Sequence, residues 1–190
     1  MNDEILPPRR LNGLIIAIVI VGAMAILLAL AIRPDPSLQK GKPFPPIEVA
    51  GWINGPGPTA DDLKGQIFVV DAWAFWCGPC RAAVPELLKL QKKYAKRGVK
   101  FIGLTREGQN EKEIEESQKY VRSLKIPWPN GYGAQKPLLE LKVEGIPQLW
   151  VVGRDNRIVF QEIGWSGNSA NEIDQVLEKV LAEQPEPKNE

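Results

Sequence analysis

The sequence has no histidine and only two cysteines among its 190 residues. Without histidine, the chain lacks the side chain that most often serves as a general base at neutral pH and as a metal ligand. Two thiolates alone cannot complete a tetrahedral zinc site, so no metal site is expected. The 24 lysines and arginines nearly balance the 23 aspartates and glutamates, which argues against binding of nucleic acid. The chemistry of this chain is therefore expected at its cysteines.

Both cysteines lie in one short motif, Trp76-Cys77-Gly78-Pro79-Cys80. Two thiols this close can form a disulfide only if the backbone between them turns sharply, and Gly-Pro favours such a turn. Proline is also tolerated in the first turn of a helix, so a helix is expected to begin at the motif. Cys77 would then lie at the helix N-terminus, where the helix dipole favours the thiolate. This placement predicts Cys77 as the nucleophile and Cys80 as the shielded resolving thiol.

A purely structural disulfide is the first alternative for this motif. A bond between residues so close in sequence closes a very short loop and removes little entropy from the unfolded chain. It would therefore stabilise the fold only slightly, and a redox-active pair is the better interpretation.

A long uncharged segment lies near the N-terminus, at residues 11–32. At about 1.5 Å per residue, a helix of this length would span about 33 Å and could cross a bilayer. A cleaved signal peptide, with Ala29-Leu30-Ala31 at its cleavage site, is the alternative, but its apolar core would be unusually long. We therefore expect a cytoplasmic tail at 1–10 and a single transmembrane anchor at 11–32. The protein would lie in the inner (cytoplasmic) membrane, with its C-terminal domain facing the periplasm or the cell exterior.

The remaining chain is expected to form a proline-rich linker at 33–42, one α/β domain at 43–183 and a flexible tail at 184–190. Strands followed by helices predict parallel pairing, and a turn at 153–156 predicts a final antiparallel hairpin. The segments at 51–57 and 126–133 are expected to be turns and loop, and a capping box at Ser169 is expected to begin the last helix. The predicted strands are residues 67–70, 99–104, 149–152 and 157–163, and the predicted helices are residues 60–65, 77–97, 110–124, 138–143 and 169–180.

Residues 69–80, which read Val-Val-Asp-Ala-Trp-Ala-Phe-Trp-Cys-Gly-Pro-Cys, together with Pro85 and Gly145-Ile146-Pro147, resemble the thioredoxin superfamily. The N-terminal apolar segment and the long stretch from 104 to 145 make the chain most similar to the membrane-anchored TlpA/ResA/CcmG-type branch. The resemblance implies a thioredoxin-like fold, with a central mixed β-sheet flanked by helices. It also implies a thiol–disulfide oxidoreductase that needs no cofactor or metal.

The resemblance gives roles to residues outside the motif. Asp71 matches the buried aspartate that accepts the proton of the resolving cysteine, whereas a solvated aspartate at a strand end is the alternative. Pro147 matches a cis-proline that faces the disulfide, and the backbone of Ile146 before it would pair with substrate. Trp165 is a weaker candidate for the apolar lip of the site. The expected substrate-binding residues are Trp76, Gly78, Pro79, Ile146 and Pro147.

These features predict a monomeric, membrane-tethered enzyme that reduces disulfides of exported proteins. Its partners would be those proteins and a membrane or soluble thiol protein that donates electrons. The reducing direction is expected because Gly78-Pro79 and Ile146-Pro147 resemble thioredoxin, whereas strong oxidants of this fold combine Cys-Pro-His-Cys with Val-Pro. Apocytochrome c is a weaker expectation as substrate, because cytochrome-maturation members carry a glutamate where this chain has Ala83.

Three other functions are alternatives to the reductase. A disulfide oxidase or isomerase would use the same two cysteines in the opposite or a mixed direction. A thiol peroxidase would share the fold, but its peroxidatic cysteine lies in a Thr-x-x-Cys context. The third is a non-catalytic adaptor whose disulfide is only structural.

Overall fold

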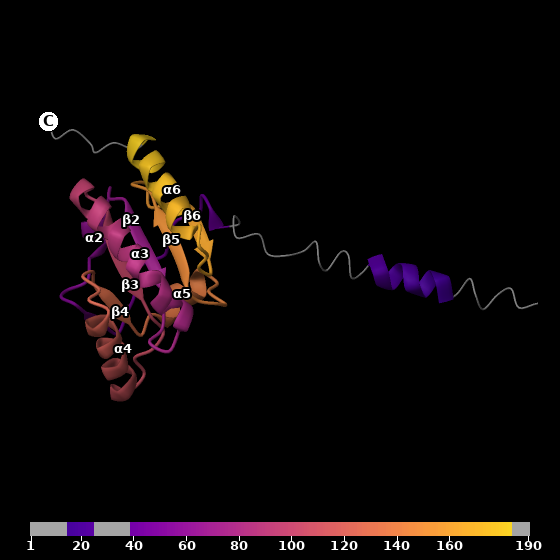
Figure 1. The fold of residues 1–190 in the computed structure, drawn as a ribbon, viewed down its shortest axis with the longest axis horizontal. Coiled ribbons are helices and arrows are strands. Elements are labelled where there is room, and N and C mark those ends of the chain that lie inside the picture. Colours follow the sequence, from indigo (N-terminus) through magenta and orange to yellow (C-terminus); the bar gives the residue numbers. More distant parts are fainter. Residues whose placement is uncertain (1–14, 25–38, 184–190) are drawn as a thin grey trace, which may run out of the picture. The chain divides into compact units, whose positions relative to one another are not determined.

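The computed structural model describes residues 15–24 and 39–183 (Figure 1). Residues 15–24 form a helix, and residues 39–183 belong to a separate unit of the chain. Within these two ranges, no helix is both long enough and apolar enough to cross a membrane. The predicted tails at 1–10 and 184–190, and much of the predicted anchor at 11–32, lie outside the described residues.

Six strands form one mixed sheet in the order β1-β4-β3-β2-β5-β6. β2 is parallel to β3 and β3 to β4, whereas β1, β5 and β6 pair antiparallel with their neighbours. This arrangement is the predicted α/β sheet, and the pairing of β5 with β6 is the predicted hairpin. The strands are β1 (Gly51–Ile53), β2 (Phe68–Ala72), β3 (Lys100–Leu104), β4 (Asn130–Tyr132), β5 (Gln148–Val152) and β6 (Ile158–Ile163).

The helices begin and end at residues that suit their termini. The side chain of Asn110 accepts the N–H of Glu113 at 3.0 Å and caps α4, as the sequence predicts. Gly98, at φ +81°, follows the 3₁₀ helix η2 in the left-handed conformation that glycine adopts readily. The helices are α2 (Ala60–Leu63), α3 (Gly78–Tyr94) with its continuation η2 (Ala95–Arg97), α4 (Glu111–Ser123), α5 (Gln135–Glu140) and α6 (Ser169–Glu183).

The sheet separates two apolar layers. One layer contains buried residues of α3, α4 and α6, and the other contains buried residues of α5. Phe68 and Val70 of β2 belong to the α5 layer, and Val69 belongs to the layer of α3. Because successive side chains of a strand point to opposite faces, Asp71 lies on the face of Val69. The helix that carries the cysteines therefore covers the face of the sheet that carries Asp71.

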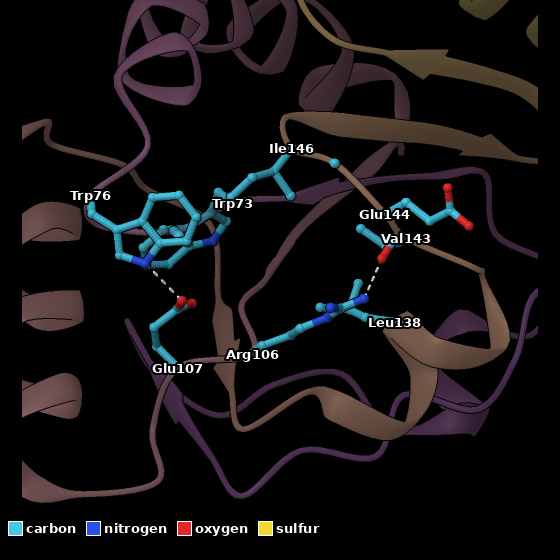
Figure 2. Close-up of a pocket in the computed structure, with 10 residues that line it drawn as sticks. Trp73, Trp76, Arg106, Glu107, Leu138, Val143, Glu144 and Ile146 are labelled. Atoms are coloured by element: carbon cyan, nitrogen blue, oxygen red, sulfur yellow. Dashed lines mark hydrogen bonds between the residues drawn. The ribbon is translucent and has the colours of Figure 1, made fainter.

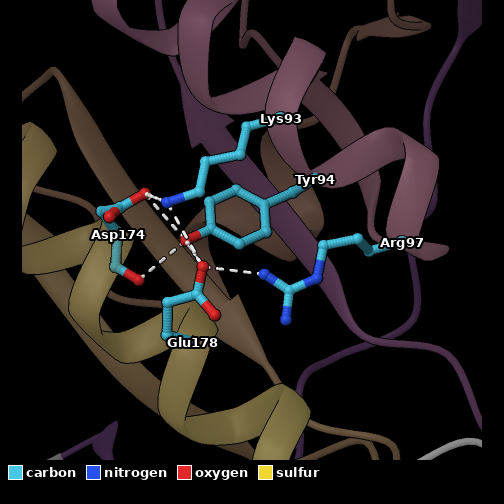
Figure 3. A network of polar contacts seen from close by, with 5 residues as sticks. All are labelled: Lys93, Tyr94, Arg97, Asp174 and Glu178. Carbon is cyan, nitrogen blue, oxygen red and sulfur yellow. Dashed lines mark hydrogen bonds and ion pairs between the residues drawn. The ribbon is translucent and has the colours of Figure 1, made fainter.

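A polar network joins the end of α3 and η2 to α6 (Figure 3). The hydroxyl of Tyr94 lies 2.7 Å from Oδ1 of Asp174, and Nζ of Lys93 lies 2.6 Å from the same oxygen. The guanidinium of Arg97 donates to Oε1 of Glu178 at 2.7 Å. The hydrogen bonds from Arg97 and Lys93 lower the pKa of Glu178 to about 2. The network fixes α6 against the helix that carries the cysteines.

Two strands occupy segments that were predicted as turns and loop. β1 lies within 51–57 and β4 within 126–133, and each has only three residues. A Cβ on Gly51 would lie 2.2 Å from Oη of Tyr132, and one on Gly131 would lie 2.6 Å from Cγ1 of Val49. The glycines in these strands therefore permit close packing rather than turns. The side chains that require a glycine at these positions are distant in sequence, so local patterns do not reveal them.

Ser169 does not form the predicted capping box. It is the first residue of α6, and its hydroxyl oxygen accepts the N–H of Ser166 at 2.9 Å and donates to Glu162. Asn168 contacts Glu172 instead, with Nδ2 donating to Oε1 at 2.6 Å. The start of the helix was predicted correctly, but the serine hydroxyl bonds to residues that precede the helix instead of capping it.

The end of the predicted linker already belongs to the domain. The N–H of Gly41 donates to the carbonyl of Ile158 at 2.7 Å, and Pro43 forms a bridge with Arg157. The chain from residue 39 onward is thus attached to the edge of the sheet at β6.

Candidate active site

Cys77 and Cys80 form a disulfide at the start of α3, with Cα atoms 5.3 Å apart. Cys77 is the N-cap residue of this helix, and its sulfur accepts the backbone N–H of Cys80 at 3.1 Å. A thiolate at this sulfur would be stabilised by the same N–H and by the helix dipole. Both cysteines are buried, whereas Gly78 and Pro79 between them are exposed. The exposed Gly-Pro turn therefore offers a partner access at the motif.

Asp71 and Cys80 line the same small cavity, which has room for about one water molecule (about 10 Å³). Pro147, which follows a cis peptide bond, and Ala83 lie in its wall as well. Two residues of α3, Cys80 and Ala83, therefore line the same cavity as the Asp71 carboxyl of β2. Because Ala83 has no polar side chain, Asp71 carries the carboxyl among the described residues that line this space.

Burial raises the pKa of Asp71 to about 7. The Asp71 backbone N–H and the nearby indole N–H of Trp128 act in the opposite direction, but burial has the larger effect. That indole N–H makes no hydrogen bond of ordinary geometry to any described residue. A carboxyl with this pKa can gain or lose a proton near neutral pH, as a proton acceptor for Cys80 requires.

β3, one of the two strands beside Asp71, contributes no side chain next to the carboxyl. Gly103 of β3 is the register partner of Asp71, and Leu149 of β5 lies on the other side. A Cβ on Gly103 would lie 2.0 Å from Oδ1 of Asn130 and 2.7 Å from Nε1 of Trp73. The space beside this glycine is thus filled by two polar groups, each without a hydrogen-bond partner among the described residues.

Trp73 belongs to a stack of three side chains beside the disulfide. Its ring lies parallel to that of Tyr120, with centroids 4.6 Å apart and planes inclined by 9°. The guanidinium of Arg81, the residue after Cys80, lies 5.0 Å from the centre of the Tyr120 ring. Burial raises the pKa of the Tyr120 hydroxyl, and the Asp71 carboxyl adds to the effect. α4 therefore fixes the aromatic floor of the site, a contribution that sequence patterns did not indicate.

Trp76 forms one wall of an open apolar pocket of about 120 Å³ (Figure 2). Its side chain is 64% exposed, and its indole N–H donates to Oε1 of Glu107 at 2.9 Å. Ile146, one residue before the cis-proline, lines the same pocket. Arg106, beside Glu107, donates to the carbonyl of Val143. This pocket is an exposed apolar surface next to the disulfide, and such surfaces commonly receive partner chains.

The structure thus brings all the predicted site residues to one end of the sheet. Asp71, Cys80 and Pro147 meet at the cavity, and Trp76 and Ile146 meet at the pocket. Sequence reasoning did not find Glu107, Tyr120 or Trp128. Among residues 15–24 and 39–183, no group of cysteine, aspartate and glutamate side chains is arranged to hold a metal ion.

Residues 39–177 match the family model described as Redoxin. The chain belongs to the Redoxin family. The thiol–disulfide oxidoreductase ResA of Bacillus thuringiensis is 28% identical over 163 residues, which cover 82% of this chain and 88% of that protein. The thiol:disulfide interchange protein DsbE of Pseudomonas aeruginosa is 29% identical over 162 residues, covering 82% and 85%. Protein FixW of Rhizobium leguminosarum is 31% identical over 134 residues, but the chain spans only 60% of its length.

Solved structures share the fold of this Redoxin-family domain. A thiol-disulfide isomerase from Corynebacterium glutamicum superposes with a TM-score of 0.65 at 21% identity, covering 74% of this chain and 96% of that one. These comparisons confirm the predicted thioredoxin-like fold, the similarity to ResA-type proteins and the class of enzyme, a thiol–disulfide oxidoreductase.

Proposed function

We propose that this Redoxin-family protein is a membrane-tethered reductase for disulfides of exported proteins. The observation that carries the proposal is the placement of the disulfide at the N-terminus of α3, with both cysteines buried and the Gly-Pro turn between them exposed. An apolar pocket beside it offers a surface for a polypeptide substrate. The uncharged segment at 11–32 supports the tether.

The reducing cycle begins with the Cys77 thiolate, which attacks one sulfur of a substrate disulfide. The substrate S–S bond breaks, one substrate thiolate leaves, and a mixed disulfide forms between Cys77 and the substrate. Cys80 then loses its proton to the Asp71 carboxylate across the shared cavity, and its thiolate attacks the sulfur of Cys77. This attack releases the second substrate thiolate and regenerates the Cys77–Cys80 disulfide. Two electrons have passed to the substrate, and a thiol protein must restore the dithiol.

Single-cysteine variants test this order of events. Cys80→Ser should accumulate a stable mixed disulfide with insulin or with envelope proteins, because the resolving thiol is missing. Cys77→Ser should trap none, because Cys80 lies inside the helix, whereas Cys77 is its N-cap residue. Equal trapping by both variants, or insulin reduction that survives Cys77→Ser, would exclude the proposed roles. An adaptor with a structural disulfide would show no insulin reduction at all.

Carbonate extraction of membranes tests the tether independently of the chemistry. The full-length protein should stay in the membrane pellet and should retain its original N-terminus. A mature chain that begins near residue 32 would instead identify the apolar segment as a cleaved signal peptide. Release of the uncleaved chain by carbonate would show that the segment does not anchor it.

A further inference from the structure

Trp165 lies in the wall of the cavity that Asp71 and Cys80 share. It comes two residues after the end of β6, and it is half-buried against the core layer that contains both cysteines. Asp71 of β2 and Trp165, which follows β6, thus line the same space although they are far apart in sequence. Trp165 therefore borders the cavity and is also partly exposed to solvent.

The backbone holds Trp165 at this place. Gly164 adopts φ +81°, a conformation that glycine tolerates and other residues rarely adopt, and this turns the chain away from β6. The N–H of Gly164 donates to the carbonyl of Pro147 at 2.8 Å. Since Pro147 also lines the cavity, the turn that carries Trp165 is fixed to the cavity wall itself.

We propose that Trp165 is a positioning residue that closes the cavity between Asp71 and Cys80 and keeps the Asp71 carboxyl out of bulk water. The cavity admits about one water molecule while the ring is in place. Loss of the ring would open it and hydrate the carboxyl. Hydration favours the charged carboxylate, so the proton would be held less tightly at neutral pH.

Few other ionisable groups face this carboxyl. Cys80 faces it from α3, and Tyr120 interacts with it from α4. The register partner on β3 is Gly103, and the β5 residues in the cavity wall are uncharged. Arg81 acts on Tyr120 rather than directly on Asp71. Apart from Asp71 itself, the described residues that line the cavity carry no charged side chain, so exclusion of water is the main influence on this carboxyl that a single substitution can remove.

The test is a carboxyl ¹³C NMR titration of the oxidised, full-length protein in detergent micelles, with labelled aspartate and with Asp71→Asn to assign the resonance. Trp165→Ala should lower the titration midpoint of Asp71 by about one pH unit, because burial is the main cause of its high value. Trp165→Phe should restore most of the shift. Trp52→Ala is the matched control, since Trp52 is half-buried in the opposite core layer.

A midpoint that stays constant in Trp165→Ala, or that falls equally in Trp52→Ala, would overturn the proposal. If Trp165→Ala does not fold, Trp165→Leu keeps an apolar but smaller side chain, and its midpoint should fall by less, but still measurably. The inference rests on the proposed function in one respect: that function has the Asp71 carboxylate accept the proton of Cys80. A midpoint that moves while the pH dependence of single-turnover insulin reduction stays fixed would uphold the role of Trp165 and reject that of Asp71.

Discussion

The indole N–H of Trp76 donates a 2.9 Å hydrogen bond to Oε1 of Glu107, which holds an exposed tryptophan beside the disulfide. Glu107 is itself held by the hydroxyl of Thr105, which donates to its other oxygen. Thr105 is buried at the end of β3. A buried residue that directly follows β3 therefore helps to position Trp76, the apolar wall of the pocket, through the carboxylate of Glu107.

Glu107→Ala should raise KM for a protein disulfide about five-fold, because one hydrogen bond is worth about 1 kcal/mol and the freed indole must be ordered on binding. Glu107→Gln keeps an acceptor oxygen and should stay close to wild type. Steady-state reduction of insulin measures the effect. Reduction of a small disulfide that cannot fill the pocket should be unchanged in both variants, and a parallel loss there would mean that Glu107 acts on the cysteines instead.

Asp71→Asn should make stability less dependent on pH. The carboxyl has a pKa of about 7 in the folded protein and 3.8 as its ordinary value, so the folded state holds the proton more tightly. The bound proton therefore stabilises the folded state relative to the unfolded state. This stabilisation is complete below about pH 4, and up to about 4 kcal/mol of it is lost as pH rises through about 7. Urea unfolding of the oxidised protein at pH 5 and pH 8 measures this loss. The asparagine variant should be the more stable one at pH 8, and an identical pH dependence in both proteins would show that the carboxyl is hydrated.

Glu178→Gln should lower the melting temperature by a few degrees at neutral pH, because it removes the charge that Arg97 and Lys93 contact (Figure 3). The pKa of Glu178 is lowered to about 2, so its contribution is present above about pH 4.5 and is lost as pH falls through about 2. Calorimetry at pH 7 and pH 2, with low and high salt, measures it. Glu183→Gln is a control on the same helix, with a single contact of 3.8 Å to Lys179. A difference that persists at pH 2 would assign the effect to packing.

The redox potential should lie nearer to about −270 mV, typical of thioredoxin, than to about −120 mV, typical of strong oxidants. The reason is that the chain has no histidine to stabilise the Cys77 thiolate further and has Gly-Pro between its cysteines. Equilibration of the full-length protein with glutathione or dithiothreitol buffers, followed by alkylation of free thiols, measures the midpoint. A midpoint above about −180 mV would favour an oxidase or isomerase over the reductase.

The parts of the fold that local sequence determines were predicted well. Continuous apolar runs predict β2 and β3, as is typical of strands that are buried on both faces, and the Gly-Pro turn places the start of α3 directly after Cys77. β1 and β4 escaped prediction because three residues carry no periodic pattern and their glycines look like turn residues. β1 pairs only with β4, and β4 lies between β1 and β3, so both strands depend on partners distant in sequence.

The same distinction applies to the site. Cys77, Cys80 and Asp71 lie within ten residues, and their motif makes them visible in the sequence. Glu107 bonds to a tryptophan 31 positions away, and Tyr120 reaches the site from α4. An aromatic residue on a helical face is normally a core residue, so nothing local distinguishes Tyr120 from its neighbours. The parts that Glu107 and Tyr120 play in the site can therefore be recognised only from the tertiary structure.

Gly103 limits how the site can change over evolutionary time. A side chain at this position would collide with both Asn130 and Trp73, so β3 cannot acquire a lysine or arginine beside Asp71 through one substitution. Such a cation would otherwise be the simplest way to lower the affinity of the carboxyl for its proton. Descendants of this domain can therefore retune that affinity only by altering several residues together, or from the helix and turn that face Asp71 on its other sides. A sequence with a larger residue at 103 should also have changed positions 73 and 130.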